Sequence, residues 1–81
     1  MKKFNFDKFI EKMWIDIDNT IKVHPYLRKG QCVYNYSWDH FRSLNLKVFD
    51  NRDVDPYYVN AKIDMFLKEL RKELQSLDLL T

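Results

Sequence analysis

Residues 24–38, HPYLRKGQCVYNYSW, decide the fold that this sequence predicts. The segment holds the chain's only glycine, its only cysteine and one of its two prolines. Because proline disfavours a helical conformation of the residue before it, a preceding helix should end near Val23. Proline and glycine are both tolerated near the start of a helix. We therefore expect a corner between Pro25 and Lys29, followed by a central helix that continues to Ser43.

Two long amphipathic segments flank this central helix. Apolar residues recur every three or four positions in residues 4–23 and in residues 60–77, which is the spacing of one helix face. Asn5 and Asn60 are suitable N-caps for these helices, and residues 78–81 are expected to fray. The two apolar faces consist of Phe6, Phe9, Ile10, Met13, Trp14, Ile17 and Ile21, and of Ile63, Phe66, Leu67, Leu70, Leu74 and Leu77.

Residues 44–58 are the least regular part of the chain. Residues 50–53 have the composition of a turn, and Asp55-Pro56 has the pattern that starts a short helical turn. An alternation of apolar residues favours a short extended piece, formed by Leu44, Leu46 and Val48. The side chains expected to plug the gaps between the helices are Phe49, Val54 and either Tyr57 or Tyr58.

These patterns predict an all-α fold, in which residues 1–81 form one compact three-helix domain with an irregular segment before the last helix. On the central helix, the stripe expected to face the core is formed by Leu27, Tyr34, Trp38 and Phe41, with Val33 and Ser37 beside it. Gly30 favours another helix packed closely over it. The alternative, a backbone cradle for an anion, is normally built from a glycine-rich loop, which this chain lacks.

The composition limits the class of protein. Hydrophobic residues make up 46% of the chain, which excludes general disorder. One cysteine and two distant histidines cannot supply a structural zinc site, so we expect no metal and no cofactor. The sequence has no apolar run that could span a bilayer and no signal-peptide pattern, which predicts a cytoplasmic protein without a membrane partner.

The charge is close to balanced. Fourteen Lys and Arg residues against 12 Asp and Glu residues give a net charge of +2, and the two signs are interspersed. A dedicated nucleic-acid-binding protein would segregate its basic side chains, and a DNA mimic would segregate its acidic ones. The charge pattern therefore argues against both classes.

One motif suggests an enzyme. Residues 16–20, DIDNT, resemble the D-x-D-x-T motif of haloacid dehalogenase-like phosphatases, in which two carboxylates above a strand end act with magnesium. That chemistry needs a doubly wound sheet, for which this chain is too short. On a helix, Asp16 and Asp18 do not face each other. We interpret them as solvated carboxylates.

A cysteine–histidine site is the other catalytic hypothesis. Cys32 lies eight residues from both His24 and His40, a spacing that does not align them on one helix face. Asp39 is adjacent to His40, so their side chains point apart. A lone cysteine in a helix usually packs as a small apolar group. We expect no catalytic residues and no enzymatic activity.

Aromatic residues make up 16% of the chain, more than a three-helix core of this length needs beside its aliphatic side chains. Some Tyr and Trp side chains should therefore be exposed, and Tyr, Trp and Arg are enriched in interface hot spots. The residues expected to bind a partner are Tyr26, Arg28, Tyr36, Arg52, Tyr57 and Tyr58. An alternative is a nucleic-acid surface formed by Arg28, Lys29 and Arg42 with Tyr34, Tyr36 and Trp38.

The spacing R-x-G-Q-x-x-x-N in residues 28–35, followed by DPYY in residues 55–58, resembles a pattern in small uncharacterised phage and bacterial proteins. The sequence departs from this pattern at residues 50–53, where a glycine would be expected. The resemblance implies a phage accessory protein that acts on a host protein, in host takeover or against a defence system. The matching residues are Trp14, Arg28, Gly30, Gln31, Asn35, Asp55, Pro56 and Tyr58.

Gln31 and Asn35 lie one helical turn apart, with Arg28 close by. We expect these three residues and Asp55 to form a structural polar cluster that pins residues 55–58 onto the central helix. The sequence thus predicts a small non-enzymatic protein-binding module. Its partner is a host protein in the host cytoplasm if a phage encodes the chain, or a second copy in a homodimer. The alternative function is a small nucleic-acid-binding protein.

Overall fold

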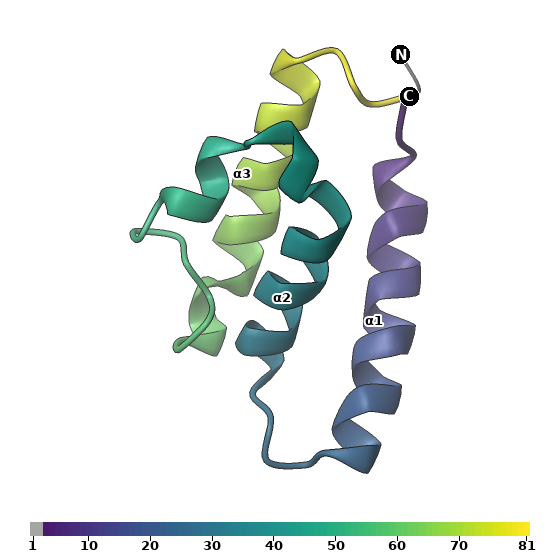
Figure 1. Cartoon of the computed structure of the whole chain (residues 1–81), viewed down its shortest axis with the longest axis vertical. Coiled ribbons are helices and arrows are strands. Elements are labelled where there is room, and N and C mark those ends of the chain that lie inside the picture. Colours follow the sequence, from purple (N-terminus) through teal and green to yellow (C-terminus); the bar gives the residue numbers. More distant parts are fainter. Residues whose placement is uncertain (1–2) are drawn as a thin grey trace.

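Three α-helices carry the fold in the computed structural model, which describes residues 3–81. Helix α1 spans Phe6–Val23, α2 spans Lys29–Phe41 and α3 spans Ile63–Ser76 (Figure 1). The prediction of an all-α, three-helix fold with an irregular segment before the last helix is therefore confirmed. The first two residues of the predicted domain lie outside the described part of the chain.

Three short 3₁₀ helices form much of the irregular connection between α2 and α3: η1 (Arg42–Leu44), η2 (Lys47–Asp50) and η3 (Asn60–Lys62). In Figure 1 this connection leaves the upper end of α2 and returns the chain to the lower end of α3. Helices α2 and α3 consequently run in the same direction, and α1 runs opposite to both.

Both ends of α1 follow from the local sequence, as predicted. The side chain of Asn5 accepts a hydrogen bond from the backbone N–H of Lys8 at 3.2 Å and so caps the helix. The helix ends at Val23, two residues before Pro25. Four side chains of its predicted apolar face are buried: Phe6, Phe9, Met13 and Ile17.

The buried face of α2 differs from the predicted stripe. Trp38 is 42% exposed and Leu27 is half-buried in the loop before the helix, so the predicted stripe through these two residues is wrong. Gly30 instead lets residues 55–60 approach the helix closely, and the small side chain of Ser37 is fully buried. The Trp38 ring covers the edge of the core, 5.3 Å from the ring of Phe49. The buried residues of α2 are Gly30, Val33, Ser37 and Phe41.

Aromatic side chains join the helices in the core. The ring centroid of Phe41 in α2 lies 4.9 Å from that of Phe9 in α1. The ring centroid of Phe66 in α3 lies 5.9 Å from that of Phe49 and 6.0 Å from that of Tyr34. The largest fully buried hydrophobic side chains of the helices are Phe41, Phe66, Met13, Leu70, Leu74 and Val33.

A carboxylate from α3 caps η2. Glu73 accepts hydrogen bonds from the backbone N–H groups of Lys47 and Val48, the second at 2.9 Å. Residues 47–50 are consequently 3₁₀-helical, and the predicted extended piece over residues 44–48 is wrong. The alternating apolar pattern reflects only neighbouring residues. It could not reveal that a side chain from a helix distant in the sequence accepts the free N–H groups of this helical turn.

The turn predicted for residues 50–53 is confirmed with a shift of one residue, since the turn conformation covers residues 52–54. The side chain of Asn51 accepts a hydrogen bond from the N–H of Asp53 at 3.1 Å. The carbonyl oxygen of Asn51 accepts another from the N–H of Val54 at 3.3 Å. Val54 is buried, as predicted, and so is Phe49.

The C-terminal residues do not fray, contrary to the prediction. The N–H of Phe4 donates to the carbonyl oxygen of Leu79 at 2.7 Å, and the N–H of Thr81 donates to that of Phe4 at 2.9 Å. Leu79 is 3% exposed, so the tail adds an apolar side chain to the core. Figure 1 shows the C-terminal end beside the segment that leads into α1. Local patterns cannot reveal a pairing between the two ends of a chain.

A change of backbone direction at Asp78 brings the tail to this position. The N–H of Leu79 donates to the carbonyl oxygen of Leu74 at 3.0 Å, and the N–H of Asp78 donates to that of Gln75 at 2.9 Å. These two bonds form a Schellman motif, in which Asp78 takes the left-handed conformation with a φ of 55°. Leu77, predicted on the apolar face, is 51% exposed, and Leu79 is buried in its place.

Candidate protein-binding surface

Residues 55–60 pack directly on the start of α2 at Gly30. A Cβ atom at Gly30 would lie 2.0 Å from the carbonyl oxygen of Pro56, so only glycine allows the two backbones to approach this closely. The N–H of Gly30 donates to Oδ1 of Asn60 at 2.8 Å. The interpretation of Gly30 as a close-packing position is confirmed, with an irregular segment in place of the expected helix.

Asn60 caps α2 rather than its own helix. Arg28 is the N-cap residue of α2 but makes no side-chain capping hydrogen bond. The amide oxygen of Asn60 satisfies the free N–H of Gly30, the second residue of α2, from outside. The prediction that Asn60 caps the last helix is therefore wrong, since η3 begins at Asn60 with Val59 as its N-cap.

Side-chain hydrogen bonds hold the rest of the segment. Nε2 of Gln31 donates to the hydroxyl of Tyr57 at 3.1 Å. The hydroxyl of Tyr34 donates to the carbonyl oxygen of Phe49 at 2.9 Å and so holds η2, the preceding part of the connection. The rings of Tyr34 and Tyr57 meet edge to face, with centroids 5.9 Å apart. The side chain of Asp55 accepts the N–H of Tyr57 at 2.9 Å in an Asx turn, and the N–H of Val59 donates to the carbonyl oxygen of Pro56 at 3.1 Å. The chain therefore turns at Asp55-Pro56 as predicted, but the turn is not helical.

Residues 55–58 are thus held on α2, but not by the predicted polar cluster. Gln31 and Asp55 both bond to Tyr57, whereas Asn35 lines a cavity between α1 and α2. The ring of Tyr34, the residue before Asn35, contacts Tyr57, whereas Asn35 lies on the face of α2 that borders α1. None of the side-chain hydrogen bonds within residues 3–81 joins two of the four predicted members, Arg28, Gln31, Asn35 and Asp55.

Tyr58 projects from this anchored segment, and its side chain is 75% exposed. The guanidinium carbon of Arg28 lies 5.3 Å from the centre of the Tyr58 ring, and the Tyr57 ring meets it with centroids 4.8 Å apart. An open cavity of about 460 Å³ adjoins the ring and is lined by Arg52, Asp55, Tyr58, Val59 and Lys62. We define the Tyr58 surface as Arg28, Arg52, Tyr58, Val59 and Lys62.

The three cations of the Tyr58 surface have no carboxylate partner within the described chain. Lys62 donates to the carbonyl oxygen of Arg52 at 3.4 Å, which uses one of its three donors. Asp55 is the one carboxylate that lines the cavity, and one of its oxygens already accepts the N–H of Tyr57. The surface therefore has an excess of positive charge. The salt bridges within residues 3–81 join Lys3 to Asp78, Asp7 to Arg71 and Glu69 to Lys72.

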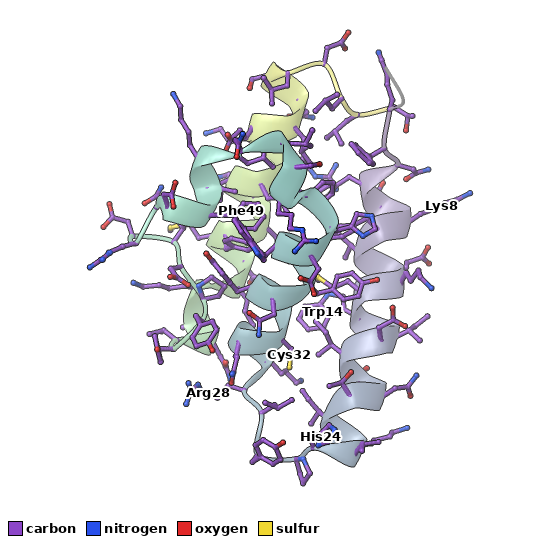
Figure 2. All side chains as sticks on the ribbon, in the orientation of Figure 1. Lys8, Trp14, His24, Arg28, Cys32 and Phe49 are labelled. Atoms are coloured by element: carbon purple, nitrogen blue, oxygen red, sulfur yellow. The ribbon has the colours of Figure 1, made fainter. Side chains whose placement is uncertain are left out.

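The structure brings four of the six predicted partner-binding residues together: Arg28, Arg52, Tyr57 and Tyr58. In Figure 2, Arg28 lies at the start of α2 on the side turned away from α1, and Lys8 projects from the outer side of α1. Val59 and Lys62 also belong to this surface but were not among the predicted residues. Both residues follow Tyr58 closely in the sequence, and neighbours in an irregular segment can line one cavity. This proximity was the sequence feature that could have indicated them.

The other two predicted residues lie elsewhere. Tyr26 is 78% exposed in the loop between α1 and α2, where its hydroxyl is 3.4 Å from Nδ1 of His24. Tyr36 is half-buried, and its hydroxyl donates to Oδ2 of Asp16 across the α1–α2 contact at 3.0 Å. Burial, together with this hydrogen bond and the charge of Asp16, raises the pKa of Tyr36. Tyr36 therefore joins two helices instead of presenting a free ring.

The residues of the two catalytic hypotheses are also placed. Asp16 and Asp18 lie on α1, and the carboxylate of Asp16 is occupied by the Tyr36 hydroxyl. Cys32 is half-buried beside the α1–α2 cavity of about 260 Å³, and burial raises the pKa of its thiol, which disfavours the nucleophilic thiolate. His40 lies on another part of α2, with its ring centroid 4.9 Å from that of Phe9. Within residues 3–81, no cluster of His, Cys, Asp and Glu has the grouping of a metal site.

Comparisons with protein-family models, with curated proteins and with solved structures give no match to this chain. None of the helices in residues 3–81 combines the length and the apolar character needed to cross a membrane. The resemblance to phage and bacterial proteins stays a prediction. The chemistry of the Tyr58 surface is therefore the basis on which we propose a function.

Proposed function

We propose that this chain is a small non-enzymatic protein-binding module that contacts its partner through the Tyr58 surface. The observation that supports the proposal is an aromatic ring, 75% exposed, on a segment that is otherwise fastened to α2. A side chain of this size in this position adds no core packing. Tyrosine and arginine, which lie together here, are enriched among the residues that dominate binding energy.

The anchoring of the segment favours binding as well. Pro56 is fully buried, Tyr57 is hydrogen-bonded to Gln31, and Asn60 is hydrogen-bonded to Gly30. These contacts restrict the backbone on both sides of Tyr58 before any partner arrives. A preorganised aromatic side chain loses little conformational entropy on binding, so more of its contact energy contributes to affinity.

The finer part of the proposal is that the partner is a host protein met in the cytoplasm of an infected cell. Its support is the resemblance to phage proteins in residues 28–35 and 55–58. The alternative protein partner is a second copy of the chain. Analytical ultracentrifugation tests this alternative, because it distinguishes a homodimer from a monomer directly.

Site-specific photo-crosslinking tests the proposal. A photoreactive phenylalanine derivative at position 58 should crosslink a defined protein from a host lysate, and the same group at position 8 should not, because Lys8 lies on the outer side of α1. Tyr58→Ala and Arg28→Gln should each weaken capture of that protein by about tenfold or more. Equal crosslinking from both positions, or capture unchanged in both variants, would contradict the proposal.

The second candidate is a small nucleic-acid-binding protein. The observation in its favour is the same Tyr58 ring beside the cations Arg28, Arg52 and Lys62, since single strands bind by stacking on rings and by phosphate contacts with cations. Binding of a single-stranded oligonucleotide that weakens steeply with salt, and that Tyr58→Ala abolishes, would support this candidate.

A further inference from the structure

We propose that the Tyr58 surface takes an acidic segment of its protein partner, in which a carboxylate side chain lies next to an apolar one. This inference rests on the proposed function and specifies the chemistry of the partner. It follows from the charges that border the ring, from the apolar area beside them, and from the small extent of the positive patch.

The cationic groups come first. Arg28 lies over the Tyr58 ring, and Arg52 and Lys62 line the cavity beside it. None of the three forms a salt bridge within residues 3–81. Arginine donors match the planar geometry of a carboxylate and can bind it with two parallel hydrogen bonds. A carboxylate from a partner would thus accept hydrogen bonds from Arg and Lys donors that have no anionic acceptor within the described chain.

An apolar area lies beside these cations. Tyr58 is 75% exposed, and the adjacent Val59 is 44% exposed on the same cavity. Burial of this area against an apolar side chain contributes roughly in proportion to the area removed from water. A ligand that carries only negative charge would leave Tyr58 and Val59 in contact with water. The surface therefore suits a segment that alternates acidic and apolar residues.

The extent of the patch favours a protein segment over nucleic acid. A single strand carries one phosphate per nucleotide and binds best along a continuous basic groove. Here Asp55 lines the same cavity as Arg52 and Lys62, and Asp53 lies exposed on the preceding turn. Those carboxylates would repel an extended phosphate chain. A short acidic segment brings fewer negative charges to the surface, where the three cations Arg28, Arg52 and Lys62 outnumber the two carboxylates.

Two synthetic peptides of equal length provide the test, one alternating Glu with Leu and the other alternating Gln with Leu. Each is titrated into the ¹⁵N-labelled chain, and the amide resonances are followed by NMR. The acidic peptide should shift the amides of residues 52–62 and of Arg28, and should bind at least about tenfold tighter than the Gln peptide. The preference should shrink as salt is added, because exposed charges are screened.

Charge-neutral variants identify the side chains responsible. Arg52→Gln and Lys62→Gln should each reduce the preference for the acidic peptide, whereas Lys8→Gln, on the outer side of α1, should preserve it. All three residues are surface side chains outside the core, and dispersed NMR spectra confirm that each variant is folded. Retention of the full preference in both Arg52→Gln and Lys62→Gln would overturn the inference.

Three further outcomes would overturn it: equal affinity for the two peptides, shifts centred on another part of the chain, or tighter binding of a single-stranded oligonucleotide at the same amides. A partner crosslinked from position 58 alongside equal affinity for the two peptides would leave the proposed function standing and remove only the acidic segment. Loss of both results would remove the proposed function as well.

Discussion

Replacement of Ser37 by alanine should stabilise the fold, because this hydroxyl is buried without a partner. The Ser37 side chain is 0% exposed on the buried face of α2. No group in the described chain forms a hydrogen bond with its Oγ atom. The hydroxyl of a serine within a helix commonly donates to the carbonyl oxygen four residues earlier, which for Ser37 would be that of Val33. This hydrogen bond is not formed here. The Ser37 hydroxyl therefore gives up its hydration on folding and gains no protein hydrogen bond.

The size of the effect follows from three contributions. A buried hydroxyl left without a partner costs about 1–3 kcal/mol, which Ser37→Ala recovers. Alanine adds a few tenths of a kcal/mol through its higher helix propensity. The missing oxygen leaves a small void, which at about 24 cal/mol per Å³ reduces the gain in stability by a few tenths of a kcal/mol. The net gain is about 1–3 kcal/mol, and each kcal/mol raises the Tm of a domain of this size by roughly 4–8 °C.

Urea unfolding followed by circular dichroism measures this gain, and a constant slope shows that the unfolded state is unchanged. Ser76→Ala is the matched control, because the Ser76 hydroxyl is exposed and donates to the carbonyl oxygen of Glu73 at 2.7 Å. Its effect should stay within about 0.5 kcal/mol. A loss of stability in Ser37→Ala would refute the reasoning, since it would show that the buried hydroxyl has a hydrogen-bond partner.

Gly30→Ala should destabilise the chain by about 2 kcal/mol or more, because the clash with Pro56 outweighs the roughly 1 kcal/mol that alanine gains over glycine in a helix. A higher urea midpoint would disprove the close contact. Asp78→Gly should stabilise it by about 1 kcal/mol, since glycine adopts a φ of 55° without strain and the exposed ion pair with Lys3 contributes little. In chemical denaturation, Asp78→Ala should show no such gain. Tyr36→Phe should reduce the loss of stability at alkaline pH. The pKa of Tyr36 is raised above its ordinary value of 10.0 in the folded state, so the unfolded state ionises first and stability falls as the pH rises through that value. Urea midpoints between about pH 8 and 11 should decline less in the variant, and an identical decline would argue against the burial of Tyr36.

The sequence predicted the elements whose ends depend on close neighbours. Helix α1 begins after Asn5 and ends before Pro25, because an N-cap and the steric restriction before proline both act within a few residues. The periodic apolar residues of α3 likewise identified a helix whose buried face includes Phe66 and Leu70. In these places the local preference and the tertiary structure agree.

The errors occur where a residue acts at a distance. Asn60 was expected to cap its own helix but bonds to Gly30 in α2. Glu73, in a surface stretch of α3, caps η2, and Leu79 pairs with Phe4 at the other end of the chain. Residue type indicates that a side chain can cap or pair, but only the packed structure selects the backbone group that it reaches.

The candidate surface shows the same limit. The composition predicted that some tyrosines are exposed, but periodicity does not apply to the irregular segment that contains Tyr57 and Tyr58. The anchoring bond between Gln31 and Tyr57 turns one ring inward and leaves the other 75% exposed. Tyr36 was expected to face a partner, yet a single acceptor on the neighbouring helix, Asp16, holds it within the α1–α2 contact.

The contacts that complete the fold also position the proposed binding surface. The Gly30–Asn60 hydrogen bond caps α2, and it fastens the segment from which Tyr58 projects. A substitution at Gly30 or Asn60 therefore alters stability and surface geometry together, and lost binding in such a variant says nothing about direct contact. The side chains of Tyr58 and Arg52 are exposed and take no part in that hydrogen bond, so their removal leaves it intact. Variants of those two residues are the ones that separate binding from folding.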